Sequence, residues 1–198
     1  MVPGLRGTVR LVLLGSLWLT VAACSRAATA EEACVVISRE RDAAVRSGEA
    51  MRMEVAARQY LDACRAIEPR NVVAVAMEEV AAARRLTGRA SEALSAANAC
   101  IEFHYEAVGC HAEKALALAQ LKLNREARDV VESGRQVGAR ELERARRDMD
   151  GSGMRRHERT AADAQARIRT GALRESLAKR GLERLAAVSA LLTQSEAR

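Results

Sequence analysis

Proline is nearly absent from this chain, and that scarcity limits the folds it can adopt. Of 198 residues only Pro3 and Pro69 are proline, so little interrupts a helix after the first few positions. Aromatic residues make up 2% of the sequence, and much of the apolar content is alanine, leucine and valine. Alanine and leucine favour helices, whereas strands prefer aromatic and β-branched residues. The composition therefore predicts an all-α fold.

Turn and capping residues divide the chain after residue 30 into short helical segments. Gly48, Pro69 and Gly88 each end a segment, and Asn71 and Ser91 can cap the helices that follow. The short turns between these segments predict antiparallel helical hairpins. The predicted helices span residues 31–46, 49–67, 71–86, 91–105 and 110–123, and a sixth starts at residue 124 and weakens at Gly134.

A spacing of small residues recurs in the second helix of each predicted hairpin. A small residue is followed four positions later by an apolar or small one, and three positions after that by another small one. Positions four and three apart lie on one helical face, so we expect the partner helix to approach closely there. The sets repeat at offsets of 36 and 34 residues; they are Ala57, Leu61 and Cys64, then Ala93, Ala97 and Cys100, then Ala127, Val131 and Gly134.

This pattern resembles the tetratricopeptide repeat and the related Sel1-like repeat, whose periods are 34 and about 36 residues. The resemblance covers residues 31–134 and is most specific over 88–100, where a turn glycine precedes the spaced small residues. It departs from the family pattern because the usual aromatic residue of the first helix is missing and the third unit has no turn glycine. A plain antiparallel helical array with coincidental spacing is the alternative. The resemblance implies a short solenoid whose first helices line a concave groove for a peptide or a helix.

Basic side chains on the helices that the resemblance places in the groove are the candidate binding residues. Such groups can pair with a carboxylate or donate to a peptide carbonyl, although each alone also fits an ordinary solvated charge. The adjacent carboxylates Glu78 and Glu79 are interpreted as helix-surface residues. The candidates are Arg84, Arg85, Lys114 and Lys122.

The spacing of the cysteines predicts two disulfides. Cys34 and Cys64 lie at equal distances in sequence from the turn at Glu49, so an antiparallel hairpin places them face to face. Cys100 and Cys110 flank a short loop between two helices and can meet in the same way. An even number of such cysteines suits an exported chain. Sel1-like repeats often carry such bridges, so the resemblance implies the same.

A metal site is the sharper alternative for the second cysteine pair. Together with His104 and His111, the Cys100 and Cys110 thiolates would supply four ligands to tetrahedral zinc. The spacing matches no known zinc finger, and oxidising conditions compete for the thiols. Free buried thiols are the third possibility, and we expect no metal and no cofactor.

The first thirty residues predict export. Two arginines precede an apolar run over 11–23, which at about 20 Å is too short to cross roughly 30 Å of hydrocarbon. The run ends in a segment, 21–24, that resembles the bacterial lipobox, in which the cysteine, here Cys24, is lipidated and becomes the mature N-terminus. Cleavage after Ala30 is the alternative. In proteins with such a lipobox, Asp after the cysteine favours retention at the inner membrane; because Ser25 follows Cys24 here, the resemblance implies sorting to the outer membrane, facing the periplasm.

The charge is distributed unevenly along the mature chain. Residues 24–134 carry 15 basic and 17 acidic side chains, whereas residues 135–198 carry 15 basic and 9 acidic ones. A linker is predicted at 150–153, and the helical stretch after it has a stripe of leucines that favours packing back on the repeats, with a break at 170–171. The predicted organisation is a leader over 1–23, a tether over 24–30, a repeat-like domain over 31–134 and a basic helical extension over 135–198.

The sequence favours a binding role over catalysis. It has no glycine-rich phosphate loop, no paired-histidine metalloprotease helix and no haem-attachment motif. The shortage of aromatic residues also argues against nucleic acid as a partner. We expect a non-enzymatic adaptor or assembly factor that binds a protein or peptide in the cell envelope. The alternatives are an envelope structural protein whose basic extension binds anionic lipid or polymer, and a Cys/His metal-binding periplasmic protein.

Overall fold

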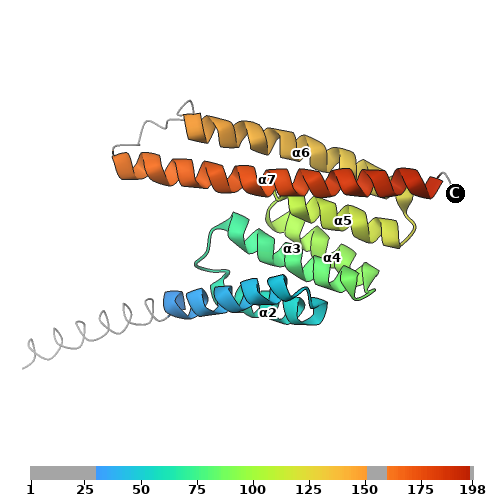
Figure 1. Ribbon diagram of the computed structural model, residues 1–198, viewed down its shortest axis with the longest axis horizontal. Coiled ribbons are helices and arrows are strands. Elements are labelled where there is room, and N and C mark those ends of the chain that lie inside the picture. Colours follow the sequence, from blue (N-terminus) through green and yellow to red (C-terminus); the bar gives the residue numbers. More distant parts are fainter. Residues whose placement is uncertain (1–29, 151–159, 197–198) are drawn as a thin grey trace, which may run out of the picture.

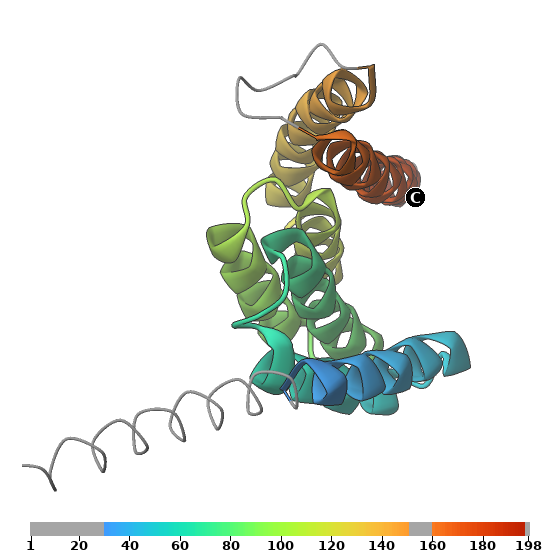
Figure 2. The same ribbon diagram turned by 90° about the vertical axis from the view of Figure 1, so that its left-hand side faces the viewer.

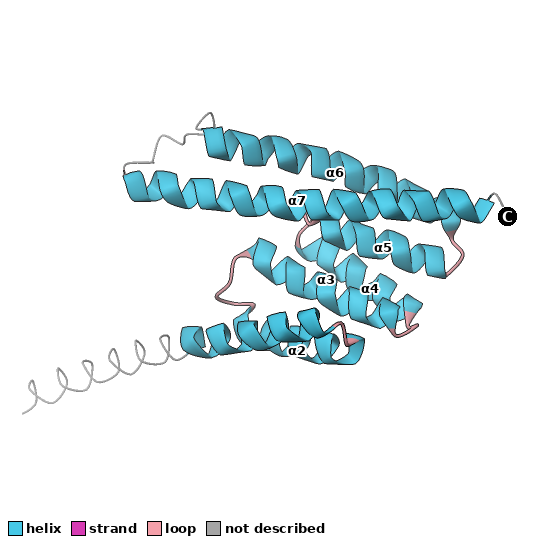
Figure 3. Ribbon diagram, viewed as in Figure 1, coloured by secondary structure: helices cyan, strands magenta, loops and turns pink. Residues whose placement is uncertain are grey.

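The computed structural model describes residues 30–150 and 160–196, and every regular element in these ranges is a helix (Figure 1, Figure 3). The predicted all-α fold is therefore confirmed. None of these helices is both long enough and apolar enough to cross a membrane. The helices are one over 30–47, then α2 (Ala50–Cys64), α3 (Arg70–Leu86), α4 (Ala90–Phe103), α5 (Val108–Gln120), α6 (Asn124–Asp150) and α7 (Ala161–Glu196).

Two predicted helix interruptions are wrong. The helix α6 runs without a break through Gly134, and α7 runs through Thr170 and Gly171. Glycine costs about 1 kcal/mol in a helix interior, but tertiary contacts can override that cost. Gly134 and Gly171 are buried where neighbouring helices touch, so they allow close packing rather than ending a helix. The predicted leader, Cys24 and residues 151–153 of the predicted linker lie outside the described residues, whereas Asp150, the first residue of that linker, is the last residue of α6.

Successive helices form antiparallel hairpins that stack in layers. Figures 1 and 2 show the helix over 30–47 and α2 in one layer, α3 and α4 in the next, and α5, α6 and α7 beyond them. The helix α3 contacts α2, α4 and α5, while α5 contacts α4, α6 and α7. Alternate helices therefore pack side by side, with α3 and α7 both resting on α5.

The spaced small residues lie in these helix contacts, as predicted. The first small residue of each set, at positions 57, 93 and 127, is fully buried. A Cβ atom added to Gly134 would lie 2.8 Å from Leu185 and 2.9 Å from the Cβ of His111, so α6 approaches both α5 and α7 there. Small side chains on this face thus permit the close stacking that the sequence indicated.

The leucine stripe of α7 packs back on the preceding helices, as expected. Leu185, Val188 and Leu192 are buried in a core shared by α5, α6 and α7, and Leu182 packs against it. Leu173, near the other end of the stripe, is 41% exposed. The largest apolar core therefore lies at the C-terminal end of the stack.

Three turns place a residue in the left-handed backbone region. Gly48 and Gly88 have φ values of 71° and 78°, and Lys122 has a φ of 64°. The backbone N–H groups of Arg89 and Leu123 donate to carbonyls five residues earlier, at Arg84 and Leu118. These bonds close the ends of α3 and α5 in the same way. Lys122 therefore takes the position of the turn glycine that the third unit lacks, 34 residues after Gly88.

Both predicted disulfides are present. Cys34 of the helix over 30–47 is bonded to Cys64 of α2, with Cα atoms 5.5 Å apart. Cys100 of α4 is bonded to Cys110 of α5, with Cα atoms 6.0 Å apart. Each bridge therefore joins two consecutive antiparallel helices.

Candidate functional site

A cleft of about 400 Å³ opens between α3 and α7. Residues 107–109 at the start of α5 contribute to its lining, and Val45 of the helix over 30–47 adds one further wall. The cleft therefore takes its lining from helices that are far apart in the sequence.

Two glycines bring α3, α5 and α7 close enough to form this cleft. A Cβ atom added to Gly181 would lie 2.6 Å from the Cβ of Val108 and 3.0 Å from the backbone nitrogen of Gly109. A Cβ atom added to Gly109 would collide with the carboxylate of Glu78. A larger residue at Gly181 would press on the Cβ and backbone atoms of α5 and separate the helices, whereas one at Gly109 would displace the Glu78 side chain.

Apolar side chains cover part of the cleft surface. Val45, Val75, Val108 and Leu177 line it, and the first three come from three different helices. Val75 and Leu177 are half-buried, so part of each side chain remains available to a ligand. A pocket with apolar walls and a few polar groups is the usual composition of a binding site.

Glu78 connects all three helices at the base of the cleft. Its carboxylate pairs with Arg184 of α7, which also pairs with the fully buried Glu113 of α5. Arg85 of α3 completes the network, because its Nε lies 2.8 Å from Glu113. Burial raises the pKa of Glu78, while the nearby Arg184 and Arg180 act against that rise. The network fixes α7 to α3 and α5.

Glu79 faces the helix over 30–47. Its Oε2 atom lies 3.5 Å from Nε of Arg41, which stacks 4.4 Å from the ring centre of Tyr60. Burial raises the pKa of Glu79 to about 7; Arg41 opposes this shift and the neighbouring Glu78 adds to it. This carboxyl therefore changes its charge near neutral pH.

The other end of the cleft holds Glu141, Arg174, Glu106 and His104. Oε2 of Glu141 lies 3.2 Å from Nε of Arg174, and its Oε1 lies 2.8 Å from Arg144, which also pairs with Glu106. Burial raises the pKa of Glu141. Burial also lowers the pKa of His104, and the positive charges of Arg70 and Arg174 add to that shift. The surroundings of His104 are therefore electropositive.

The four basic residues selected from the sequence lie outside this cleft. Arg84 is 2.9 Å from Glu54 of α2 and Arg85 is bound to Glu113, so both guanidinium groups hold neighbouring helices together. Lys114 is half-buried on α5, and Lys122 forms the turn after it. Arg85 and Lys122 instead line a second hollow of about 350 Å³ beside Leu191 and Leu192.

The residues that do line the cleft were missed or misread in the sequence. Glu78 and Glu79 were interpreted as helix-surface residues, but their side chains are only 22% and 15% exposed. The helix α3 contributes as expected, through its N-terminal half. The expected contribution of residues 111–123 is wrong, because α5 lines the cleft only with Val108 and Gly109. The spacing of Arg180 and Arg184 by four residues on α7 was the available signal, because it places two cations on one helical face.

The proposed metal ligands do not converge in this oxidised structure. The Sγ atoms of Cys100 and Cys110 are bonded to each other and lie 3.4 and 3.8 Å from the carbonyl oxygen of Ala74. Nε2 of His111 lies 2.9 Å from the carbonyl oxygen of Tyr105. Across residues 30–150 and 160–196, no three His, Cys, Asp or Glu side chains are grouped so that they could hold a metal ion.

Comparison with known proteins adds no relative: no protein-family model, no curated protein and no solved structure matches this chain. The functional argument therefore depends on the cleft itself. Its glutamates are engaged with arginines and its walls are partly apolar, an arrangement suited to holding a ligand by shape and charge.

Proposed function

We propose that this protein is a non-enzymatic adaptor or assembly factor that holds a segment of another protein in the cleft between α3 and α7. The observation that carries the proposal is the cleft of about 400 Å³ lined by alternate helices of a stacked array. Stacked helical hairpins commonly bind extended peptides or helices in the groove on one side of the stack. The proposal requires no cofactor and no metal.

We place this activity in the cell envelope. The leader-like residues 1–23 and the lipobox-like segment ending at Cys24 support a lipid anchor in the outer membrane, with the protein facing the periplasm. Two disulfides fit an oxidising compartment. The resemblance to tetratricopeptide and Sel1-like repeats supports an adaptor role in the same compartment.

Loss of the protein from the membrane fraction in a Cys24→Ala variant would support the anchor, and full retention would contradict it.

Site-specific photo-crosslinking in the native envelope tests the binding role. A photoreactive amino acid replaces Val75 in the cleft, and a second variant carries it at Val55, which is 55% exposed on α2 and outside the cleft. We expect a discrete adduct from position 75 that position 55 does not give, with the bound protein identified by mass spectrometry.

A third variant separates the main proposal from the basic-extension alternative. The same amino acid at Arg135, exposed on α6 and outside the cleft, reports on partners of that extension. Adducts from position 135 with none from position 75 would overturn the cleft proposal and favour an extension that binds the partner or an envelope polymer.

A further inference from the structure

All the carboxylates that line the cleft are already paired with arginines. Each of the four glutamates has at least one guanidinium within ion-pair distance, so a cationic ligand would compete with an arginine at every one of them. A basic ligand would have to displace an existing arginine from its partner. The pairs are Glu78 with Arg184, Glu79 with Arg41, Glu106 with Arg144, and Glu141 with Arg174 and Arg144.

Two of the cleft arginines have no acidic partner in the part of the chain that the structure describes. Arg180 is exposed on α7 and makes no ion pair there, although its charge lowers the pKa of the nearby Glu78 and Glu79. Arg70, at the start of α3, stacks 5.0 Å from the ring centre of Phe103 and donates to the carbonyl oxygen of the same residue. The Phe103 contacts leave the charge of Arg70 unpaired, and the glutamates that attract Arg180 make their direct ion pairs with Arg184 and Arg41 instead.

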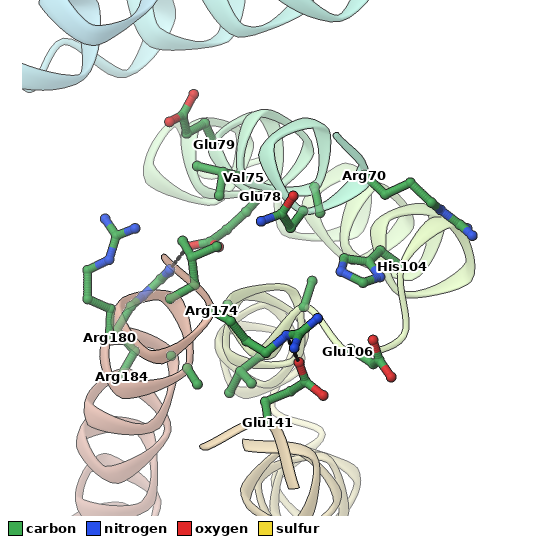
Figure 4. Close-up of a pocket in the computed structure, with 18 of the residues that line it drawn as sticks. Arg70, Val75, Glu78, Glu79, His104, Glu106, Glu141, Arg174, Arg180 and Arg184 are labelled. Atoms are coloured by element: carbon green, nitrogen blue, oxygen red, sulfur yellow. Dashed lines mark hydrogen bonds and ion pairs between the residues drawn. The ribbon is translucent and has the colours of Figure 1, made fainter. Parts of the chain in front are cut away.

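These two arginines stand at opposite ends of the cleft, as Figure 4 shows. The surface between them includes the apolar side chains of Val75, Val108 and Leu177. The cleft thus presents a positive charge, an apolar stretch and a second positive charge. Complementary charges at such a site raise association rates and exclude partners of the wrong sign.

We propose that the cleft recognises an extended acidic segment of another protein, in which carboxylate side chains flank at least one apolar residue. This inference rests on the proposed function and specifies its ligand. Arg70 and Arg180 each bind one carboxylate, while the apolar residue packs on Val75 and Leu177. A neutral segment would leave both arginines uncompensated, and a basic one would be repelled by them.

Selection from a display library of random octapeptides tests this ligand chemistry on the oxidised, full-chain protein. We expect the wild type to enrich octapeptides with Asp or Glu on both sides of an apolar residue. The charge-reversed variant R70E/R180E should weaken binding of the most enriched peptide at least about tenfold and should itself enrich Lys and Arg instead. The matched control R58E/R135E reverses two exposed arginines outside the cleft and should bind within about twofold of wild type.

The outcomes separate this inference from the function on which it rests. Enrichment of peptides without acidic residues, which nevertheless compete with a cross-link at position 75, would overturn the acidic-segment inference and leave the adaptor function standing. An acidic preference that R70E/R180E retains, with the variant folded by circular dichroism, would also overturn it. Failure of every peptide to enrich, together with no adduct at position 75, would contradict both.

Discussion

The stack has two regions that are held together by different means. Between residues 30 and 120 the helices are short, with 13 to 17 residues in α2 to α5, and a disulfide joins each of two consecutive pairs. The helices α6 and α7 are 27 and 36 residues long and contain no cysteine. Their packing depends on buried leucines and valines and on glycines at the contacts.

The difference shows how core composition decides what else a helical array needs. Alanine buries little apolar surface, so the short hairpins gain little from the hydrophobic effect and covalent links add to their stability. Longer helices that bury leucine and valine along their length gain more from packing alone. The cleft lies between α3 of the first region and α7 of the second, so its shape depends on both kinds of stabilisation.

Removal of the Cys34–Cys64 bridge should have the largest effect. It tests whether the short hairpins depend on their disulfides for stability. The bridge spans 30 residues, and closing a loop of that size contributes about 3–4 kcal/mol by the chain-entropy model. We expect the double variant C34A/C64A to lose about that much in urea unfolding. Hydrogen exchange should increase in the helix over 30–47 and α2 but not in α6 and α7. If hydrogen exchange in C34A/C64A increased equally in all four helices, the two regions would not be stabilised by different means.

Substitution of Gly181 by alanine tests whether close packing at the contact between α7 and α5 stabilises the second region. Alanine normally favours a helix over glycine by about 1 kcal/mol, so in open space this change would stabilise α7. The new Cβ would instead lie 2.6 Å from Val108 and 3.0 Å from the backbone of Gly109, and overpacking of this kind typically costs 1–3 kcal/mol. We expect a net loss of up to about 2 kcal/mol in thermal or urea unfolding. A gain in stability, or the same result as Ser176→Ala on the exposed surface of α7, would refute the packing account.

Glu79→Gln tests the junction between the first layer and the cleft. The folded protein holds the proton on Glu79 more tightly than the unfolded chain, because burial raises its pKa from 4.5 to about 7. The stability that this group contributes below pH 4.5 is therefore lost as the pH rises through 7. The shift corresponds to roughly 3 kcal/mol at most, and since the carboxyl borders the open cleft we expect about 1–2 kcal/mol.

The variant should match the wild type near pH 4 and exceed its stability at pH 8, as measured by urea unfolding at both values. Glu40→Gln, on the exposed surface of the helix over 30–47, controls for the change in net charge. A Glu79→Gln variant that is less stable than wild type at pH 8 would mean that the pair with Arg41 outweighs the cost of burial.

Lys122→Gly is the smallest expected effect and concerns the repeat geometry. Lys122 has a φ of 64°, where a side chain is strained and glycine is not. We expect glycine to raise the unfolding free energy by about 0.5–1 kcal/mol, and Lys122→Ala, which keeps the strain, to change it little. If both variants give the same change, backbone strain at this turn is not the cause.

Local signals in the sequence were sufficient for the turns of the short hairpins and for the disulfides, but they failed at Gly134 and Gly171, where the helices continue. Turn residues such as Gly48 and Gly88 end helices through backbone geometry that depends only on their neighbours. Cysteines at equal distances from a hairpin turn meet because the two helices have the same rise per residue. The face formed by small residues follows from helical periodicity in the same way. None of these features requires knowledge of how distant segments pack.

The cleft depends on contacts that local signals do not contain. Glu78 and Arg184 are 106 residues apart, and their pairing follows from the position at which α7 settles along α5. That position is set by the close approach of Gly181 to Val108 and Gly109. In the sequence Gly109 looks like an ordinary loop residue and Gly181 like an ordinary glycine within a helix. Arg84 was selected because the resemblance places its helix in the groove, whereas the layer stacking directs it to Glu54. Tertiary packing therefore decided which charges line the site.

The most direct test of the central claim, that the cleft between α3 and α7 is the binding site, is the affinity of a cleft-filling variant. Val75→Trp places an indole in the cleft, and Val55→Trp adds the same group to the exposed surface of α2. Isothermal titration of the octapeptide that is most enriched on wild type gives both affinities, with circular dichroism to confirm the fold. We predict at least about a tenfold loss for Val75→Trp and wild-type binding for Val55→Trp. Wild-type affinity in a folded Val75→Trp variant would contradict the assignment of the cleft as the binding site.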